Sequence, residues 1–241
     1  MTLLKVRGVG KSFGGVQALR SVDLHVEQGE TLGLMGSNGA GKTTLFSIIA
    51  GHVRPSVGEV WFKNRSIRRL RPDKVCRLGI ARTFQIVRPF AGLTVRDNVE
   101  VAILFGSGSR DYEEALSERA LRVLAEVGLE DRANSLAATL TLSARKRLEV
   151  ARAIATDPEL LLLDEVMAGL TPREGEEMIE LINQIKLRRP LSIVVVEHVV
   201  KALTTLSDRI VVLHQGEIIV DGLPGEVIHH PIVRAAYFGE G

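Results

Sequence analysis

Residues 36–43 of this chain read Gly36-Ser37-Asn38-Gly39-Ala40-Gly41-Lys42-Thr43, which matches the phosphate-binding pattern GxxxxGK[ST]. A strand candidate, Thr31 to Met35, precedes this loop, and a helix candidate, Thr43 to Ala50, follows it. Glycines let the backbone fold around an anion and direct successive amides at it, and a helix N-terminus adds favourable charge. The lysine of the pattern reaches the β- and γ-phosphates, and the Thr43 hydroxyl can hold Mg²⁺. The stretch predicts nucleoside triphosphate binding, with a glycine-rich turn before a helix as the structural alternative.

An acidic pair ends a second strand candidate, because Asp164 and Glu165 follow the apolar run Leu160 to Leu163. The carboxyl end of a buried parallel strand lies at the sheet edge where ligands of such folds bind. Triphosphate hydrolysis needs an acidic partner for the metal and a residue that positions the attacking water. We expect Asp164 to orient the Mg²⁺ shell and Glu165 to polarise the water; a simple strand cap is the alternative.

Hydrophobic patterning predicts an α/β fold, a P-loop NTPase with a parallel core and an antiparallel layer at its start. Val22 to Val26 alternates apolar and polar residues, whereas Leu160–Leu163 and Ser192–Val196 are continuous apolar runs typical of parallel strands. Capping-box spacing at Thr94–Asp97 and Thr171–Glu174 predicts helices that begin at about Val95 and Pro172. Further helical patterns cover residues 113–127 and 145–155. We expect one domain over residues 1–241, with a helical subdomain at about 86–156 inserted in the catalytic core.

Composition narrows the class of protein further. The chain has 241 residues, a formal net charge of +2 and one cysteine, Cys76. It is long enough for a buried core, and its charge is too small to argue for a nucleic-acid partner, so none is expected. A lone cysteine, no apolar signal segment at the N-terminus and no membrane-length apolar run predict a cytoplasmic protein. The basic run from Lys63 to Arg77 is interpreted as a solvated turn and helix face, with contact to nucleic acid or anionic lipid headgroups as the alternative.

Further motifs, in order along the chain, resemble the ATPase subunit of an ABC transporter over essentially the whole length. Phe13 with neighbouring Val16 resembles the aromatic position that stacks on adenine in that family, and Gln85, in Thr83-Phe84-Gln85, resembles the Q-loop glutamine. His198, in Val196-Glu197-His198, resembles the switch histidine that contacts the γ-phosphate. The resemblance implies ATP and Mg²⁺ as cofactors and Glu165, His198 and Gln85 as catalytic residues. It implies Mg²⁺ contacts from Thr43, Gln85 and Asp164, and ATP contacts from Phe13, Val16, Gly36, Ser37, Asn38, Gly39, Ala40, Gly41, Lys42, Thr43 and Thr44.

One family motif is altered. The Leu-Ser-Gly-Gly-Gln signature, which acts in trans on the partner's ATP, corresponds here to Leu140 followed by Thr141, Leu142, Ser143 and Ala144. Both glycines and the glutamine are missing, so close backbone approach to a phosphate is harder at Ser143. The helix N-terminus can still present amides. Ser37 replaces the family's usual proline, and Thr171 replaces an acidic or amide residue.

Within that family, residues 83–95, 164–170 and 235–239 are similar to the branched-chain amino acid importer group, in particular the subunit with the Thr-Phe-Gln form. This similarity implies import of branched-chain or other small hydrophobic amino acids; urea, short amides and aromatic acids are the alternatives that relatives transport. It implies a second, similar ATPase subunit in a heterodimer, with a homodimer as the alternative, and two membrane permease subunits. A periplasmic or extracellular substrate-binding protein would act indirectly, and the chain would lie on the inner face of the membrane.

Three other functional classes remain as rivals. A soluble ABC-type ATPase that acts on nucleic acid or ribosomes generally carries two cassettes or a long coiled coil, and neither is present in these 241 residues. A small GTPase would carry an Asn-Lys-x-Asp motif, which does not occur. The altered signature keeps a third rival open, a nucleotide-responsive scaffold with little hydrolysis.

Overall fold

The computed structural model describes residues 1–84, 89–106 and 115–235, and the chain divides into two compact units. The first unit comprises residues 1–75 and 192–241, and the second comprises residues 76–191. Helix α2 (Pro72–Arg77) contains the boundary between residues 75 and 76.

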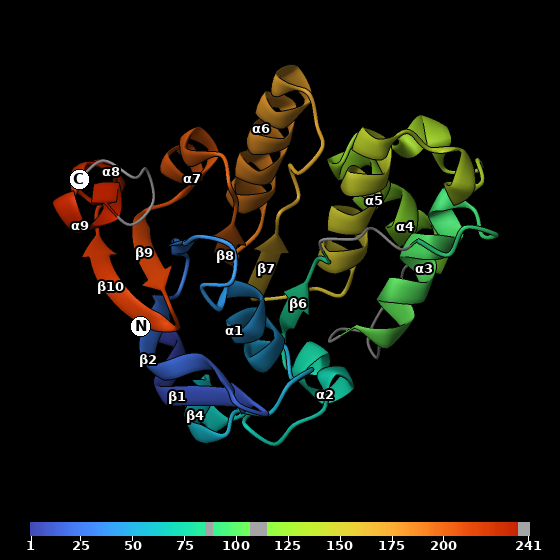
Figure 1. Cartoon of the computed structure of the whole chain (residues 1–241). Coiled ribbons are helices and arrows are strands. Elements are labelled where there is room, and N and C mark those ends of the chain that lie inside the picture. Colours follow the sequence, from blue (N-terminus) through green and yellow to red (C-terminus); the bar gives the residue numbers. More distant parts are fainter. Residues whose placement is uncertain (85–88, 107–114, 236–241) are drawn as a thin grey trace. The chain divides into compact units, whose positions relative to one another are not determined.

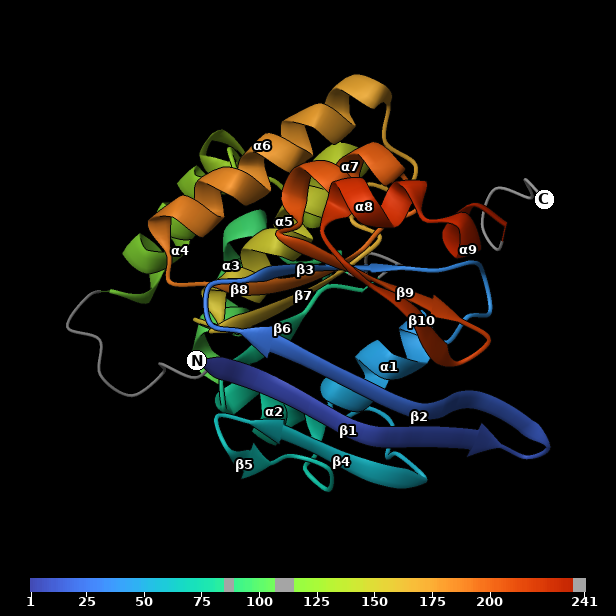
Figure 2. The same ribbon diagram turned by 90° about the vertical axis from the view of Figure 1, so that its left-hand side faces the viewer.

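An antiparallel sheet occupies the N-terminal part of the first unit (Figure 2). Its strands run in the order β2 (Val16–Glu27), β1 (Thr2–Phe13), β4 (Val57–Phe62) and β5 (Arg65–Ser66). Val22, Leu24 and Val26 are buried while Asp23 and His25 between them are exposed, as the period-two pattern predicts. The expected antiparallel layer at the start of the chain is therefore confirmed.

The same unit holds a second set of strands in the order β10 (Glu217–Gly222), β9 (Arg209–His214), β3 (Thr31–Met35) and β8 (Ser192–Val196). β3 pairs in parallel with both β8 and β9, and every residue of β3 and β8 is buried. The continuous apolar runs therefore correctly predict strands covered on both faces. Helix α1 (Lys42–Ile49) lies between this sheet and the antiparallel one, and α7 (Val200–Leu206) and α8 (Pro224–His229) lie on the opposite face (Figure 2). A last short helix, α9 (Pro231–Val233), follows α8.

The second unit combines two parallel strands with helices. β6 (Ile80–Arg82) pairs with β7 (Leu160–Asp164) in parallel, in a register that places Arg82 beside Leu162. Helices α3 (Val95–Phe105), α4 (Leu116–Glu126) and α5 (Leu142–Ala155) pack on one another (Figure 1), and α6 (Pro172–Arg188) follows β7. Two short 3-10 turns, Glu130–Arg132 and Ala137–Thr139, connect α4 to α5.

Helix boundaries follow the capping residues. Thr94 and Thr171 form the two capping boxes, with Asp97 and Glu174 as partners, and α3 and α6 begin at the expected residues. The helix expected from Arg145 begins three residues earlier, at Leu142, because the Thr141 side chain caps it. The bounds 86–156 of the helical subdomain stay a prediction, and residue 86 lies outside the described residues. Within the described part of the chain, no helix is both long enough and apolar enough to cross a bilayer.

Candidate nucleotide-binding site

The phosphate loop follows β3 in the first unit and is packed tightly against neighbouring backbone. A Cβ atom at Gly36 would collide with the carbonyl oxygen of Leu213, on β9. Gly41 has φ 110°, and a Cβ there would lie 2.6 Å from the carbonyl oxygen of Ala18. Two backbone hydrogen bonds hold Ala40 in place. Its N–H donates to Ser37 O within the loop (3.1 Å), and its carbonyl accepts from Gly216 N, which follows β9 (2.9 Å). Only glycine fits the two crowded positions, so the loop geometry depends on them.

Lys42 opens helix α1 and turns its side chain back over the loop. Its Nζ donates to Gly36 O (2.5 Å) and Ser37 O (3.0 Å), and the residue is buried. The neighbouring loop residues Asn38 and Gly39 are exposed, as is Thr43. Thr44 is half-buried in the first turn of α1. The ammonium group and the first amides of the helix therefore lie at the same loop, where a phosphate would meet both.

Phe13 and Val16 flank the turn of the β1–β2 hairpin. Phe13 is 49% exposed and Val16 is 68% exposed, so neither is a core residue. The Nζ of Lys11 lies 4.8 Å from the centroid of the Phe13 ring. An exposed aromatic ring beside a cation is suited to stacking on a nucleobase.

His198 follows β8, the strand next to β3. The parallel register pairs Gly33 with Val195, so His198 and the phosphate loop leave the sheet at the same edge. His198 is exposed, and Glu197 before it is buried. Within the first unit, the fold therefore places the histidine and the loop beyond the same ends of neighbouring strands.

Asp164 and Glu165 lie in the second unit, at the carboxyl end of β7. Asp164 is buried, and its Oδ2 accepts a hydrogen bond from Arg82 Nη2 at 2.7 Å. Its backbone N–H donates to the hydroxyl of Thr83 (3.0 Å), which is also buried. Arg82 is the last residue of the neighbouring strand β6, and Thr83 follows it directly. The two contacts therefore hold Asp164 in place from the end of β6.

Glu165 has a left-handed backbone with φ 51°, a conformation that costs a non-glycine residue about 1–3 kcal/mol. Its carbonyl accepts hydrogen bonds from Lys146 Nζ (3.0 Å) and Ala168 N (3.1 Å). Lys146 is buried and comes from α5, the helix that follows the altered signature. The strained turn is thus held in part by the signature helix.

A buried carboxylate connects α5 to the end of β6. The backbone N–H of Phe84 donates to Glu149 Oε1, and Glu149 is 7% exposed. Burial raises the pKa of Glu149, against the opposing effect of that hydrogen bond. The next residue after Phe84 is Gln85, which lies outside the described residues. Glu149 therefore holds the backbone directly before the predicted Q-loop glutamine.

The altered signature begins α5. Thr141 is the N-cap, and its hydroxyl accepts a hydrogen bond from Ala144 N (3.3 Å). Leu142 is 48% exposed, and its Cδ2 would lie 3.1 Å from a Cβ atom built on Gly169. Ser143 is half-buried. The hydroxyl of Thr141 therefore caps its own helix, while Leu142 and Ser143 place side chains where the family has glycine.

The predicted Mg²⁺ ligands fit the ion in their chemistry. Hydroxyl and carboxylate oxygens are the hard donors that Mg²⁺ prefers, and this ion usually keeps waters and substrate phosphates in its shell. One protein carboxylate, from Asp164, is then sufficient. Among the described residues, no three or more histidine, cysteine or acidic side chains form a cluster that could hold a metal.

Four residues of this region, namely Arg82, Thr83, Lys146 and Glu149, were not among the sequence candidates. Their partners are distant in sequence, so spacing alone does not identify them. Lys146 and Glu149 lie three residues apart on α5, and only the structure shows that both are buried. The loop and His198 lie in one unit, and Asp164, Glu165 and residues 141–144 lie in the other.

Comparison with known proteins identifies the family. The family profile described as ABC transporter matches residues 19–168. The high-affinity branched-chain amino acid transport ATP-binding proteins LivG of Salmonella typhimurium and Escherichia coli are 37% and 38% identical, over 99% of this chain and 98% of each relative. BraF of Pseudomonas aeruginosa is 36% identical over the same shares.

Solved structures of ABC transporter cassettes share the fold of this chain. An ATP-binding cassette of an ABC transporter in its ADP conformation superposes with a TM-score of 0.90 at 28% identity, covering 100% of both chains. A dimeric cassette in a post-hydrolysis state, bound to ADP and Pi, has a TM-score of 0.82 at 28% identity and covers 92% of this chain and 99% of the other. The phosphate loop, the cassette fold and the whole-length similarity together establish that this chain belongs to the ABC transporter family, as an ATP-binding ATPase subunit.

Proposed function

We propose that this chain powers the import of branched-chain or other small hydrophobic amino acids. The observation that carries the proposal is its similarity, over nearly the whole length of both chains, to ATP-binding proteins named for high-affinity branched-chain amino acid transport. The similarity is not confined to the phosphate loop that all such ATPases share. It supports membership of the same importer group.

The residues support an ATP hydrolysis site with divided roles. Phe13 and Val16 offer an exposed surface to adenine, and residues 36–44 hold the phosphates with their amides and with Lys42. Thr43, Asp164 and Gln85 would hold Mg²⁺, which when bound neutralises charge on the β- and γ-phosphates. Glu165 would accept a proton from the attacking water while that water's oxygen attacks the γ-phosphorus, and the bond from this phosphorus to the β–γ bridging oxygen would break to release ADP. His198 would contact the transferred phosphoryl group.

The catalytic site would be completed by a second cassette. A dimeric structure is known for a similar cassette, in a state bound to ADP and Pi. In such a pair each signature serves the ATP of the partner, so residues 141–144 would act on the partner's nucleotide. We propose a non-identical partner, with a homodimer as the alternative, docked with it on two permease subunits at the inner face of the membrane. A substrate-binding protein on the other side would deliver the amino acid.

The altered signature favours a second candidate function, a nucleotide-responsive scaffold in which the ATP site completed by residues 141–144 hydrolyses little. Leu142 and Ser143 occupy space that glycine leaves open, and Thr141 already caps its own helix. These features weaken the site that this signature would complete. They do not affect residues 36–44, which would use the partner's signature.

Co-purification of the complex, followed by an ATPase assay, tests the proposal. The chain is expressed with its candidate partner ATPase and permeases, and the complex is reconstituted with the binding protein. Leucine, isoleucine or valine should stimulate ATP hydrolysis, whereas urea, short amides and aromatic acids should not. Stimulation by one of those other compounds alone would overturn the substrate assignment, and basal hydrolysis that no compound changes would favour the responsive subunit.

A further inference from the structure

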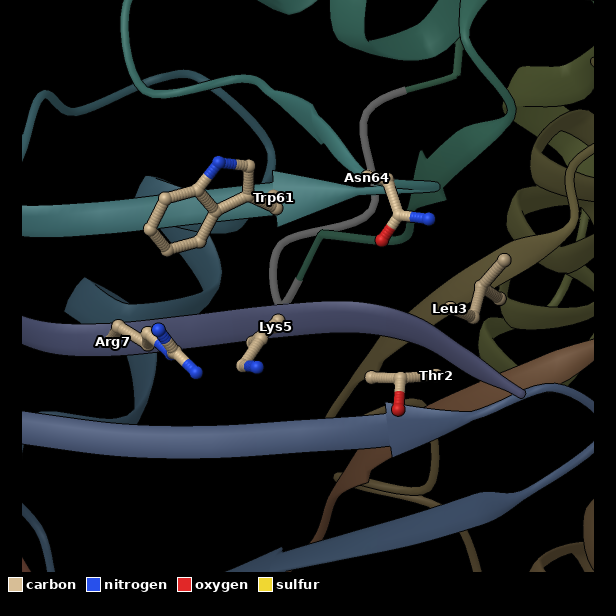
Figure 3. Close-up of a pocket in the computed structure, with 6 residues that line it drawn as sticks. All are labelled: Thr2, Leu3, Lys5, Arg7, Trp61 and Asn64. Atoms are coloured by element: carbon tan, nitrogen blue, oxygen red, sulfur yellow. The ribbon is translucent and has the colours of Figure 1, made fainter.

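A groove lies on the outer face of the antiparallel sheet, at the end of β1 away from the nucleotide site. Its volume is about 340 Å³, and its lining residues are Thr2, Leu3, Lys5, Arg7, Trp61 and Asn64 (Figure 3). Phe13 lies six residues beyond Arg7 along β1, which corresponds to about 20 Å in an extended strand. None of the lining residues belongs to the ATP site described above, so the groove is separate from it.

Strand register explains why these residues meet. β1 runs antiparallel to β4, and Lys5 pairs directly with Trp61 while Arg7 pairs with Glu59. Lys5 and Arg7 are two residues apart and therefore point to the same face of the sheet. The Phe62–Arg65 turn places Asn64 at the end of the groove, as Figure 3 shows.

The groove carries positive charge that the described part of the chain does not neutralise. Among the residues that the structure describes, no side chain forms an ion pair or hydrogen bond with Lys5 or Arg7. The acidic groups nearby have other partners: Glu59 binds Arg68 (2.9 Å), Glu27 binds the N-terminal ammonium (2.9 Å), and Asp23 accepts from Gly8 N (3.1 Å).

Trp61 supplies an apolar wall beside the two cations. Trp61 is half-buried, and its indole ring lies over β4 on the side of Lys5 and Arg7 (Figure 3). A partly exposed tryptophan has a flat face for stacking and an N–H for hydrogen bonding. Two cations without a side-chain partner in the described part of the chain, one amide and one indole face form a polar and apolar combination typical of a small-ligand site.

We propose that this groove binds a small anion built on a planar ring, with the ring against Trp61 and the anionic group between Lys5 and Arg7. A carboxylate and a phosphate both satisfy this chemistry. The ligand is therefore either an aromatic carboxylate or a nucleoside monophosphate, and two probes distinguish these sources.

The experiment uses the intrinsic fluorescence of Trp61, because it is the only tryptophan in the chain. Benzoate and adenosine monophosphate are titrated separately into the Lys42→Ala variant, in which nucleotide binding at the phosphate loop is suppressed. We expect saturable quenching by at least one probe, and the responding probe identifies the anion class. High salt should weaken that binding, because the cations are exposed.

Matched variants decide whether the groove is responsible. Lys5→Gln and Arg7→Gln should each weaken binding about fivefold, as expected for the loss of one exposed ionic contact. Arg20→Gln removes an exposed charge from β2 of the same sheet, outside the groove, and should leave the affinity unchanged. No saturable quenching with either probe overturns the proposal, as does equal binding by the Lys5→Gln/Arg7→Gln double variant, once circular dichroism shows that the variant is folded.

Discussion

Gly36 is the residue at which loop geometry and nucleotide binding are most closely linked. A methyl group there would collide with the Leu213 carbonyl, and overpacking of this kind costs about 1–3 kcal/mol. We predict that Gly36→Ala lowers ATP affinity by at least about tenfold, since the amides that face the phosphates must shift. The measurement is titration with a fluorescent ATP analogue.

The matched control is Gly15→Ala in the β1–β2 turn. Gly15 has no atom within 4 Å of a built Cβ and does not need a positive φ. This variant should bind the analogue as the wild type does. If Gly36→Ala bound equally well, the loop would tolerate the shift, and the argument from close packing would be wrong.

Arg82 neutralises the buried carboxylate of Asp164. Both side chains are almost completely buried, and removal of one partner of such a pair typically costs about 3–5 kcal/mol. We predict a loss of that order for Arg82→Leu in urea unfolding. Arg71→Leu, which removes the exposed ion pair with Asp73, should change stability by less than about 0.5 kcal/mol. Equal losses for the two variants would refute a special role of the buried pair.

At the scale of elements, Glu149 connects α5 to the backbone after β6. Its pKa is raised by burial, so the folded protein holds this proton at pH values where the unfolded chain has released it. Stability therefore decreases as pH rises from the unfolded pKa of about 4.5 through the raised folded pKa.

Glu149→Gln removes this titration but keeps an oxygen that can accept from Phe84 N–H. We predict that the variant loses less stability than the wild type as pH rises from about 4.5 through the raised folded pKa of Glu149. Thermal unfolding across that range is the measurement, with Glu180→Gln on the exposed face of α6 as the control. A pH profile identical to that of the wild type would exclude Glu149 as the source.

The elements also show what the sequence can and cannot predict. Thr171, Pro172 and Glu174 specify the start of α6 locally, and β8 was predicted with the observed bounds from its apolar run. β3 was predicted with the observed bounds as the strand that precedes the phosphate loop. The Arg82–Asp164 pair joins residues 82 positions apart. Only the pairing of β6 with β7 brings these two residues together, so no local sequence pattern predicts the Arg82–Asp164 contact.

At the scale of the whole molecule, the altered signature predicts two unequal ATP sites. The site built on Lys42 would use the partner's signature, whereas the partner's phosphate loop would use Thr141 to Ala144. Substitution of Lys42 should therefore remove most of the ATP turnover of the pair. Substitution of the corresponding lysine in the partner should remove only a small part of that turnover. Single-lysine variants of the reconstituted complex provide the measurement, and equal losses would contradict the inequality.

Restoring the missing glycines is the complementary variant. In Leu142→Gly/Ser143→Gly, the start of α5 regains room for close backbone approach, at a helix cost of about 1 kcal/mol per glycine. Turnover at the partner's phosphate loop should rise. A variant that folds but gains no activity there would show that the two side chains are not the obstacle.

The most direct test of ATP hydrolysis at this chain's own site is the Glu165→Gln variant, assayed with its partner subunit and ATP. Glutamine keeps the size of the side chain but cannot accept the proton of the attacking water. We predict that the variant binds ATP normally, loses nearly all turnover at this site and accumulates as an ATP-bound dimer, measured by size-exclusion chromatography with nucleotide analysis. Turnover equal to that of the wild type in the same complex would contradict Glu165 as the general base.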